Sequence, residues 1–596
     1  MRASTGLAAL MALTNLAALA QDTRPMENLG RGVVAVRSSD DDVLITWRLL
    51  GLDPDDIGFN IYRSTDSGSP TQLNTDPLTN GTNYLDTNAT LTSSNTYFIR
   101  PVVSDKEQSR SASFTLPADS ATEPIIRIPV RSTGSMKYVW VGDLDGDGEY
   151  DFVVDRHNER QSVEAYSSNG TFLWEVDLGP NSENQNNISP GSTAISTGNW
   201  DGVTVYDFDS DGYAEVAIRI ANGVTFGDGE TFSHDDDDVQ FVAILDGRTG
   251  KLRAKSQIPD DYIEHGPLGA RFGVGYLDGR TPHLVAFMKV RREDKKFMRM
   301  QGAWTFDGES VTEEWILRDN ATDGADGHNT RILDVNGDGK DDVAEIGFVI
   351  SGEGKILYKM PDQVVHGDRF HIAKMDPTRD GLQGYGIQQD NPDGLMEYYY
   401  DAGTGEMIWE HYEDETGDVA RGMAGDIDPT HPGYEVWSFS GVYNAASNEL
   451  TTDDAALAPW PHLGVWWDGD ELLELLNDGK IEKWDWENPS ESGGVPRLVT
   501  AGSFGAKSMG GRYPGFVGDI LGDWREEVIM TNDANDELII FTTDQPSEIR
   551  LYTLAHNPAY RNAMTLKGYL QSHHVDYFLG KDMETPAQPK IHYVGA

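Results

Sequence analysis

Aspartates recur in this sequence at a spacing that suits a calcium ion. The stretch VGDLDGDGEYDFVV places Asp143, Asp145, Asp147 and Asp151 in the order D-x-D-x-D-G-x-x-D. Alternate carboxylates on a tight turn that contains glycine converge on one point, and they repel one another unless a cation lies between them. Carboxylate oxygens gathered in this way are the ligands that Ca²⁺ takes in proteins. The spacing therefore predicts a Ca²⁺ site.

The same arrangement returns further along the chain. Related sets occur in YDFDSDGYAEVAI, LDVNGDGKDDVAEI and MAGDIDPTHPGYEVW, and they comprise Asp207, Asp209, Asp211 and Glu215; Asp334, Asn336, Asp338 and Asp342; and Asp426, Asp428 and Glu435. An EF-hand would need a helix on each side of the loop. Here each acidic turn leads into a β-branched run, which predicts a strand. We expect several Ca²⁺ ions in these turns, some of them in a functional cleft; the alternative is a solvated acidic turn without an ion.

Composition narrows the class of protein. The 596 residues include 47 basic and 98 acidic side chains, and the formal net charge is −51. This balance argues against nucleic acid as a partner, because nothing would neutralise the phosphates. The chain has no cysteine, so we expect the metal turns to give the stabilisation that disulfides give other secreted proteins. We expect a monomer.

The N-terminus predicts secretion. Residues 1–20, MRASTGLAALMALTNLAALA, combine Arg2, an apolar middle and the small-residue sequence ALA before Gln21. This is the pattern of a signal peptide. No later apolar segment is long enough to span a bilayer, so we expect an extracellular protein that has no membrane partner.

Two all-β domains are expected after the signal peptide. Residues 21–122 alternate in short runs, with Val43, Ile45 and Trp47 on one face, which predicts a small β-sandwich similar to fibronectin type III domains. Residues 123–596 repeat a strand, tight turn and strand between acidic turns. Eight such turns predict an eight-bladed, calcium-binding β-propeller. DELLELLND is the clearest segment with helical periodicity.

Basic and aromatic residues in glycine-rich loops are the candidates for chemistry. They are His328 in DGHNTRILD, His366 in VVHGDRFHIAKMD, Arg421 in DVARGMAGDID, Lys507 and Arg512 in GSFGAKSMGGRYP, and Tyr569 and His574 in LKGYLQSHH. Most such side chains in proteins are solvated surface charges or satisfied polar core residues. Bases are scarce in this chain, however, and these lie beside acidic turns. We therefore interpret them as lining a site near the centre of the propeller.

Several long motifs resemble the rhamnogalacturonan lyases of polysaccharide lyase family 11. They include NLGRGVVAV, VGDLDGDGEYDFVV, HGDRFHIAKMDP, GDVARGMAGDIDP, GVWWDGDELLELL and YTLAHNPAYR, and the likeness runs from about residue 27 to 583. The resemblance implies a calcium-rich propeller with a central active site. It also implies β-elimination at a galacturonate in the rhamnose–galacturonate backbone of pectin, an acidic plant polysaccharide.

The resemblance also implies roles for individual residues. Lys507 would be the base, Arg421 would stabilise the carboxylate or the intermediate, and Tyr569 would contact substrate or assist as an acid. Removal of a proton beside a carboxylate needs that carboxylate neutralised, and a cation lowers the barrier by stabilising the enolate-like intermediate. The remaining residues implied as substrate-binding are His328, His366, Phe504, Gly505, Arg512 and His574.

Departures from the family pattern leave other functions open. Phe504-Gly505-Ala506-Lys507 stands where the family reads Asn-Gly-Thr-Lys, and the segment 155–162 replaces a longer, asparagine-rich one. Loss of sugar-binding hydrogen bonds changes specificity. The alternatives are a lyase for rhamnose–glucuronate polymers of the ulvan or arabinogalactan type, a non-catalytic propeller that binds glycans through calcium, and a glycoside hydrolase.

Overall fold

The computed structural model describes residues 23–183, 202–259, 268–291, 297–318, 324–414, 417, 421–451, 459–488 and 494–595. The predicted signal peptide and residues 415–416 and 418–420 just before Arg421 lie outside these ranges. Within them the fold is all-β, as predicted, and the one α-helix is α4 (Pro558–Thr565). Three 3₁₀ helices accompany it: η1 (Pro180–Ser182), η4 (Ala501–Phe504) and η5 (Leu554–His556). No helix in the described ranges is long and apolar enough to cross a bilayer.

Two sheets build the N-terminal part and enclose a core between them. One comprises β2 (Val34–Arg37), β3 (Val43–Thr46) and β6 (Asn83–Asp86); the other comprises β4 (Gly58–Thr65), β5 (Thr71–Gln72), β7 (Asn95–Val103), β8 (Lys106–Glu107) and β9 (Phe114–Leu116). Ile45, Phe59 and Tyr97, from three of these strands, are fully buried in one cluster. Strand β3 is buried at all four of its positions, whereas the short outer strands β5 and β8 are exposed.

Eight antiparallel sheets make up the rest of the described chain. The first four, in chain order, are β11 (Val139–Gly142), β12 (Asp151–His157), β13 (Gln161–Tyr166) and β14 (Phe172–Asp177); β15 (Val203–Tyr206), β16 (Glu215–Ile220), β17 (Phe241–Leu245) and β18 (Leu252–Gln257); β19 (Leu268–Gly275), β20 (His283–Arg291), β21 (Phe297–Phe306) and β22 (Val311–Arg318); and β23 (Arg331–Leu333), β24 (Asp342–Glu345), β25 (Phe348–Ile350) and β26 (Ile356–Lys359).

The next three sheets follow the same order. They are β27 (Phe370–Ala373), β28 (Gln383–Ile387), β29 (Leu395–Asp401) and β30 (Met407–Tyr412); β31 (Met423–Gly425), β32 (Glu435–Trp437) and β33 (Val442–Asn444); and β34 (Leu463–Val465), β35 (Glu474–Asn477), β36 (Lys480–Glu482) and β37 (Arg497–Thr500). The segment DELLELLND, expected to be helical, instead supplies strand β35. Its Glu474 is fully buried because it turns toward Lys483.

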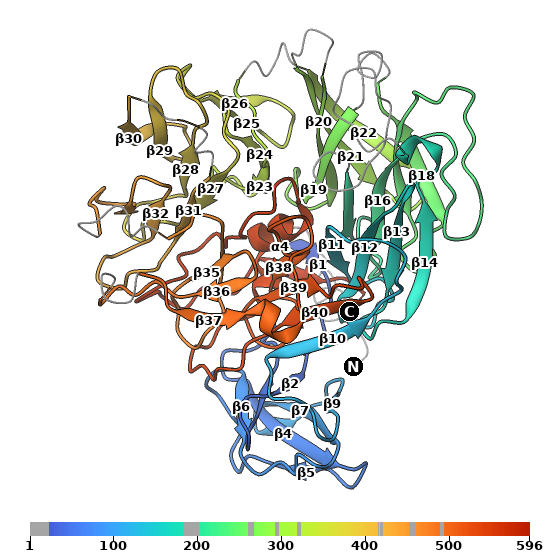
Figure 1. Cartoon of the computed structure of the whole chain (residues 1–596), viewed down its shortest axis with the longest axis vertical. Coiled ribbons are helices and arrows are strands. Elements are labelled where there is room, and N and C mark those ends of the chain that lie inside the picture. The colour runs from blue at the N-terminus through green and yellow to red at the C-terminus, as the bar shows by residue number, and fades with distance from the viewer. Residues whose placement is uncertain are drawn as a thin grey trace, which may run out of the picture.

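The eighth sheet joins the two ends of this region. It comprises β38 (Phe516–Gly518), β39 (Glu527–Thr531), β40 (Glu537–Phe541) and, paired with β40, the much earlier strand β10 (Ile125–Pro129). The chain ends meet as well, because β1 (Arg24–Met26) pairs in parallel with β41 (Ile591–Tyr593). Figure 1 shows the sheets arranged around α4, with the N-terminal sheets to one side.

Helix α4 lies at the centre of the sheets. We call the strand that comes first in chain order in each sheet, and β38 in the eighth, its first strand; several first strands contact the helix. It touches β11, β15, β19 and β23, and successive first strands also touch one another. Asn557 caps the helix by accepting a hydrogen bond from the Tyr560 backbone N–H, and Pro558 opens it. The Asn-Pro pair is a recognisable helix start. Strands packed between neighbouring sheets are buried on both faces, so β11 is buried at every position.

The direction of the first strands separates two faces of the molecule. Each acidic turn follows the end of a first strand, as Asp143 follows β11 and Asp426 follows β31. The turns of neighbouring sheets touch, since Ala214 donates its N–H to the Asp143 carbonyl at 2.7 Å. We call this side the acidic face. The loops that precede the first strands, including those that hold His328, His366, Arg421 and Arg512, form the opposite side, which we call the basic face.

A buried ion pair ties the N-terminal segment to the central helix. The Arg561 guanidinium holds the Glu27 carboxylate with Nε–Oε2 and Nη2–Oε1 distances of 2.9 and 2.5 Å, and the two side chains are 1% and 4% exposed. Both charges have left water, so each depends on the other for compensation.

We expect Arg561→Met to lower the free energy of unfolding by about 3–5 kcal/mol, because Glu27 then stays buried without its partner. Denaturant titration of the folded protein measures this. The double variant Arg561→Met/Glu27→Gln should lose much less, and Arg160→Met, which removes a surface ion pair with Glu183, should leave the unfolding midpoint close to the parent's. Equal losses in all three would contradict the assignment.

Candidate active site

Three of the residues chosen from the sequence meet on the basic face. The rings of His328 and Tyr569 stack with centroids 4.2 Å apart, and the His366 ring lies 5.0 Å from that of His328. The backbone N–H of Tyr569 donates to the His328 carbonyl at 3.1 Å. His328 and His366 precede β23 and β27, whereas Tyr569 comes from the C-terminal segment after α4. Residues far apart in the sequence are thus brought together.

Asp368 completes a set of possible metal ligands. Its Oδ1 lies 3.4 Å from His328 Nε2 and 3.9 Å from His366 Nε2. The three residues each offer a ligand atom, and these atoms all lie within 4.8 Å of one another. Burial lowers the pKa of His328 to about 2, so its imidazole is neutral and keeps the lone pair that a metal needs. Two imidazoles and a carboxylate suit a divalent cation.

An ion pair between Lys289 and Asp326 orients His366 of this group. The Lys289 ammonium lies 3.1 Å from Asp326 Oδ2, and the Asp326 carbonyl lies 2.8 Å from His366 Nδ1. Burial would raise the pKa of Asp326, but Lys289 and Arg299 lower it to about 2. Asp326 therefore remains ionised, and its backbone carbonyl fixes which nitrogen of His366 turns toward Asp368.

A second group of the basic face surrounds His462. Arg369 donates to the His462 carbonyl, and the His462 ring lies 4.7 Å from that of Tyr513. The pKa of His462 falls to about 2, first through burial and then through the positive charges of Arg369, Arg421 and Arg512. The predicted residues Arg421 and Arg512 therefore lie close to a single imidazole, and this side of the site is cationic.

Arg369, His462 and Tyr513 were not among the residues chosen from the sequence. Each stands just before, or a few residues before, the first strand of its sheet, as the chosen residues do. That shared position is the signal that could have found them. Arg369 is fully buried and also donates to the Leu570 carbonyl at 3.0 Å, so it holds the C-terminal segment in place.

The loop that holds Lys507 lies over the last sheet. Lys507 pairs its backbone with Thr531 at the end of β39, and its ammonium lies 3.3 Å from the carbonyl and 3.8 Å from the carboxylate of Asp533. Phe504 packs on Phe541 and accepts a hydrogen bond from Arg127 of the outer strand β10. Gly505 follows in the left-handed region, at φ 77°. Lys507 therefore lies at the end of β39 and Phe504 lies against β40. The side chain of Phe504 packs on the sheet.

His574 does not face the surface, contrary to its expected contact with substrate. It is 4% exposed, and its Nε2 lies 3.0 Å from Nδ1 of the fully buried His371. The sequence alone could not show whether His574 is buried or faces substrate, because buried and exposed histidines both occur beside glycine-rich loops in this chain. In this structure His574 can act on substrate only through neighbours.

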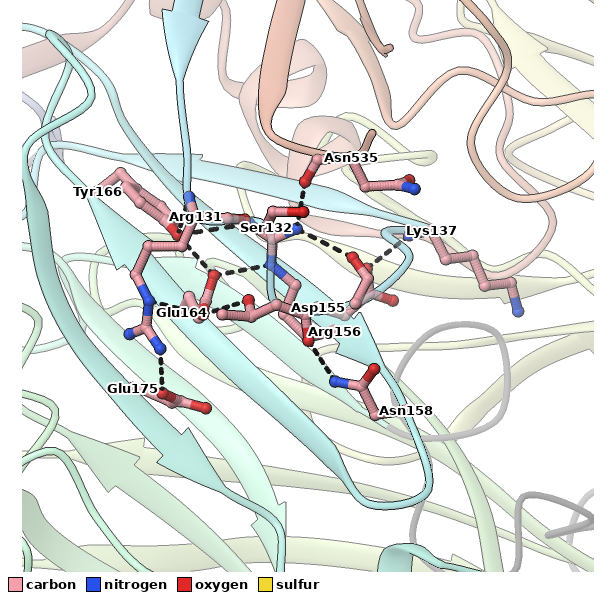
Figure 2. Close-up of polar contacts among 12 residues, drawn as sticks. Arg131, Ser132, Lys137, Asp155, Arg156, Asn158, Glu164, Tyr166, Glu175 and Asn535 are labelled. Carbon is pink, nitrogen blue, oxygen red and sulfur yellow. Dashed lines mark hydrogen bonds and ion pairs between the residues drawn. The ribbon is translucent and has the colours of Figure 1, made fainter. Parts of the chain in front are cut away.

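A polar network fixes the first sheet beside the Lys507 loop (Figure 2). The fully buried Arg156 and Glu164 pair at 2.7 Å, and Arg156 also donates to the Asn535 carbonyl of the last sheet at 2.9 Å. Asp155 accepts the Lys137 backbone N–H at 2.7 Å, while the Lys137 side chain points away from the network. Burial lowers the pKa of Lys137. Lys137 is therefore a second candidate base on this face.

Two of the predicted acidic turns bring three carboxylates together. In the first, Asp143 Oδ1 and Oδ2 accept the N–H groups of Gly146 and Gly148 at 2.7 and 2.9 Å, and Asp334 repeats this with Gly337 and Gly339. One oxygen each of Asp143, Asp145 and Asp151, and likewise of Asp207, Asp209 and Glu215, lie within 4.8 Å of one another. The remaining predicted ligands lie in the sequence beside these: Asp147 in the first turn, Asp211 in the second, and Asn336, Asp338 and Asp342 in the turn that begins at Asp334.

These carboxylates are short of compensating charge. Burial, with repulsion from neighbouring carboxylates, raises the pKa of Asp151 to about 8 and that of Glu215 to about 9. In the fourth turn, which carries Asp428 and Glu435, Asp426 Oδ1 is buried without a hydrogen-bond partner. An all-oxygen set with an orphaned buried oxygen fits a hard cation such as Ca²⁺.

The acidic turns do not lie in the candidate active site, contrary to the expectation that some of their ions sit in a cleft. They follow the first strands, whereas His328, His366 and Arg421 precede them. A strand of three or four residues rises by roughly 10 Å. A cation held in these turns can brace the sheets, but it cannot touch a sugar bound on the basic face.

One acidic turn already contains a cation of the chain itself. The Lys483 ammonium lies 2.5 Å from Asp468, 2.7 Å from Asp470 and 3.0 Å from Glu474. These three carboxylates form the same kind of cluster as those above. The Asp207 turn likewise holds a cation of the chain, because Arg253 lies 2.6 Å from Glu215 and 3.0 Å from Asp209.

Comparison with known proteins identifies the class of this fold and site. The family model of the rhamnogalacturonan lyase family 11 C-terminal domain matches residues 130–589, and the model of the rhamnogalacturonan I lyase β-sheet domain matches residues 24–116. Such proteins are polysaccharide lyases, enzymes that break a carbon–oxygen bond. The chain belongs to rhamnogalacturonan lyase family 11.

Relatives match over nearly their whole length. Rhamnogalacturonan endolyase YesW of Bacillus subtilis is 32% identical over 96% of this chain and 93% of its own, and rhamnogalacturonan exolyase YesX of the same organism is 30% identical over 96% and 98%. The crystal structure of YesW matches with a TM-score of 0.82, and that of the Bacillus licheniformis lyase with 0.81 at 29% identity, each over 96% of this chain and 100% of the other.

We expect Lys483→Met to bind about one more divalent cation per chain than the parent, because Asp468, Asp470 and Glu474 then lose their internal cation. Metal analysis after equilibration with Ca²⁺ and gel filtration gives the count. Lys355→Met, which removes a lysine that is 74% exposed, is the control and should leave the count unchanged. A folded Lys483→Met protein with the parent's count would contradict the prediction.

Proposed function

We propose that this protein cleaves rhamnose–uronate backbones by β-elimination, with rhamnogalacturonan I as the first substrate. Family membership supports the reaction class, and the charge of the basic face supports the substrate class. In a chain of net charge −51, the positive charges of Arg369, Arg421 and Arg512 all act on His462 and help to lower its pKa. A local positive field of this kind attracts a polyanion that the rest of the surface repels.

The chemistry assigns a task to each part of this face. Arg421 and Arg512 hold and neutralise the uronate carboxylate, which lowers the barrier to removing the neighbouring proton. Lys507 takes that proton and Tyr569 assists as an acid at the leaving oxygen, roles that the family resemblance implies; Lys137 is the alternative base. His328, His366 and Asp368 would hold a divalent cation, and such a cation would supply further positive charge to the site.

We also propose that the eight sheets are the blades of a propeller braced by Ca²⁺. The shared sheet of β10 with β40 and the contacts among first strands support the blade arrangement. The orphaned Asp426 oxygen and the raised pKa values support the ions. Since the chain has no cysteine, such ions would take the stabilising part that disulfides play elsewhere. We further propose a secreted monomer whose partner is an acidic plant or algal polysaccharide, with no nucleic-acid or membrane partner.

A glycan-binding protein without catalysis is the second candidate. The observation that favours it is the engagement of Lys507 by Asp533, together with Phe504 and Ala506 in place of polar residues in that loop. To accept a proton from substrate, the Lys507 side chain would have to move away from the Asp533 carboxylate. Rhamnose–glucuronate polymers remain the alternative substrates for a lyase.

The purified protein should release an unsaturated uronate, which absorbs ultraviolet light, from rhamnogalacturonan I. Ulvan and gum arabic serve as comparison polymers, and a chelator is added in parallel. A rise that depends on a divalent cation supports β-elimination, and the polymer that gives it names the substrate. Saturated products from any of the three would overturn the lyase proposal in favour of a hydrolase, and binding without products would favour the second candidate.

We expect Lys507→Ala to lower kcat by at least a hundredfold if Lys507 is the base, the usual scale for a general base. Lys137→Ala tests the alternative on the same assay, and Lys355→Ala is the matched surface control. A far-ultraviolet spectrum and an unfolding midpoint like the parent's show that folding survives. If Lys507→Ala keeps full activity while Lys137→Ala loses it, the base is Lys137.

A further inference from the structure

Two aromatic side chains stand exposed and in contact on the surface. Phe439 and Trp460 are 44% and 43% exposed, and their ring centroids lie 5.0 Å apart at an interplanar angle of 66°. Large aromatic rings are costly to leave in water and are normally packed inside, as most tryptophans of this chain are. An exposed pair that touches is therefore a candidate for contact with another molecule.

Chain direction places both residues on the basic face. β31 begins just after Arg421 on this face, and β32 runs antiparallel to it, so the turn that follows β32 returns to the same side. Phe439 lies in that turn. Trp460 stands just before β34 and accepts the His462 N–H at its carbonyl at 2.9 Å. The pair thus bridges two neighbouring sheets.

The aromatic pair adjoins the cationic part of the candidate active site. His462, two residues after Trp460, packs against Tyr513 and lies in the field of Arg369, Arg421 and Arg512. The aromatic pair is therefore linked, through the segment from Trp460 to His462, to the groups that carry this positive charge. Such a pairing matches a polymer in which an acidic sugar alternates with a neutral one.

We propose that Phe439 and Trp460 form a subsite for a neutral sugar of the polysaccharide, next to the position where Arg421 and Arg512 hold the uronate carboxylate. A deoxy sugar such as rhamnose offers a methyl group and a face of C–H bonds that can pack on these rings. A uronate there would lose water from its carboxylate without gaining a cation. The substrate named here rests on the proposed function; the carbohydrate contact itself does not.

Kinetics on two substrate lengths tests the subsite. For Trp460→Ala and Phe439→Ala we expect KM on rhamnogalacturonan I to rise roughly tenfold, the scale of a central aromatic contact, with kcat nearly unchanged. On the shortest oligosaccharide that is still cleaved, KM should move much less. Tyr412→Ala is the control, because Tyr412 is 51% exposed among acidic neighbours at Asp393 and Glu413.

Binding that does not require turnover separates this inference from the proposed function. Native electrophoresis in gels that contain rhamnogalacturonan I or polygalacturonate shows retardation by each polymer. We expect Trp460→Ala to lose retardation by rhamnogalacturonan I, while weak retardation by polygalacturonate, which has no neutral sugar, stays as in the parent. Trp460→Phe should restore part of the binding.

The outcomes distinguish the two proposals. If the parent releases no unsaturated product but is retarded through Trp460, the subsite stands and the lyase proposal fails. If the parent cleaves rhamnogalacturonan I while Trp460→Ala and Phe439→Ala keep its KM and its retardation, the subsite is overturned. Equal loss on both polymers would also overturn it, because the rings would then not select a neutral sugar.

Discussion

Repulsion between buried carboxylates is the constraint on which this structure depends. Several first strands end in a turn that gathers acidic side chains where water is largely excluded, and such a cluster is unfavourable unless a positive charge lies within it. In one turn the positive charge is Lys483. In another it is Arg253, which lies 2.6 Å from Glu215 and 3.0 Å from Asp209. The turn of Asp143, Asp145 and Asp151 brings its oxygens equally close, and a bound Ca²⁺, as proposed, would balance it.

This constraint also organises the molecule into two faces. Among the described segments, β23, β31 and β38 each carry an acid just after their end and a basic residue before their start, so contacts among first strands place like chemistry on one side. The acidic turns brace neighbouring sheets through contacts such as Ala214 with the Asp143 carbonyl. The opposite side is left free to hold arginines and histidines close together. The acidic turns and the charged residues of the candidate active site are thus separated by the length of a strand.

The C-terminal segment completes the site by filling the centre of the fold. Helix α4 contacts the first strands, and Tyr569 after it stacks on His328. Arg331 and Arg369 donate to the carbonyls of Ser572 and Leu570 along the same segment. Because it lies within reach of several sheets at once, this segment couples their positions. A site assembled in this way needs several of the sheets to be formed.

The sequence by itself determined the all-β class, the acidic turns with their ligand spacing, and the family, because strand alternation and turn chemistry are local and the motifs are long. It also named His328, His366, Arg421 and Tyr569, which stand beside recognisable turns. Only the tertiary structure decided that His574 is buried against His371, that Lys507 pairs with Asp533, that DELLELLND is a strand, and that the acidic turns lie away from the site. The reason is physical: burial, pairing and the side of a sheet on which a loop emerges depend on residues far away in the chain, which a local pattern does not contain.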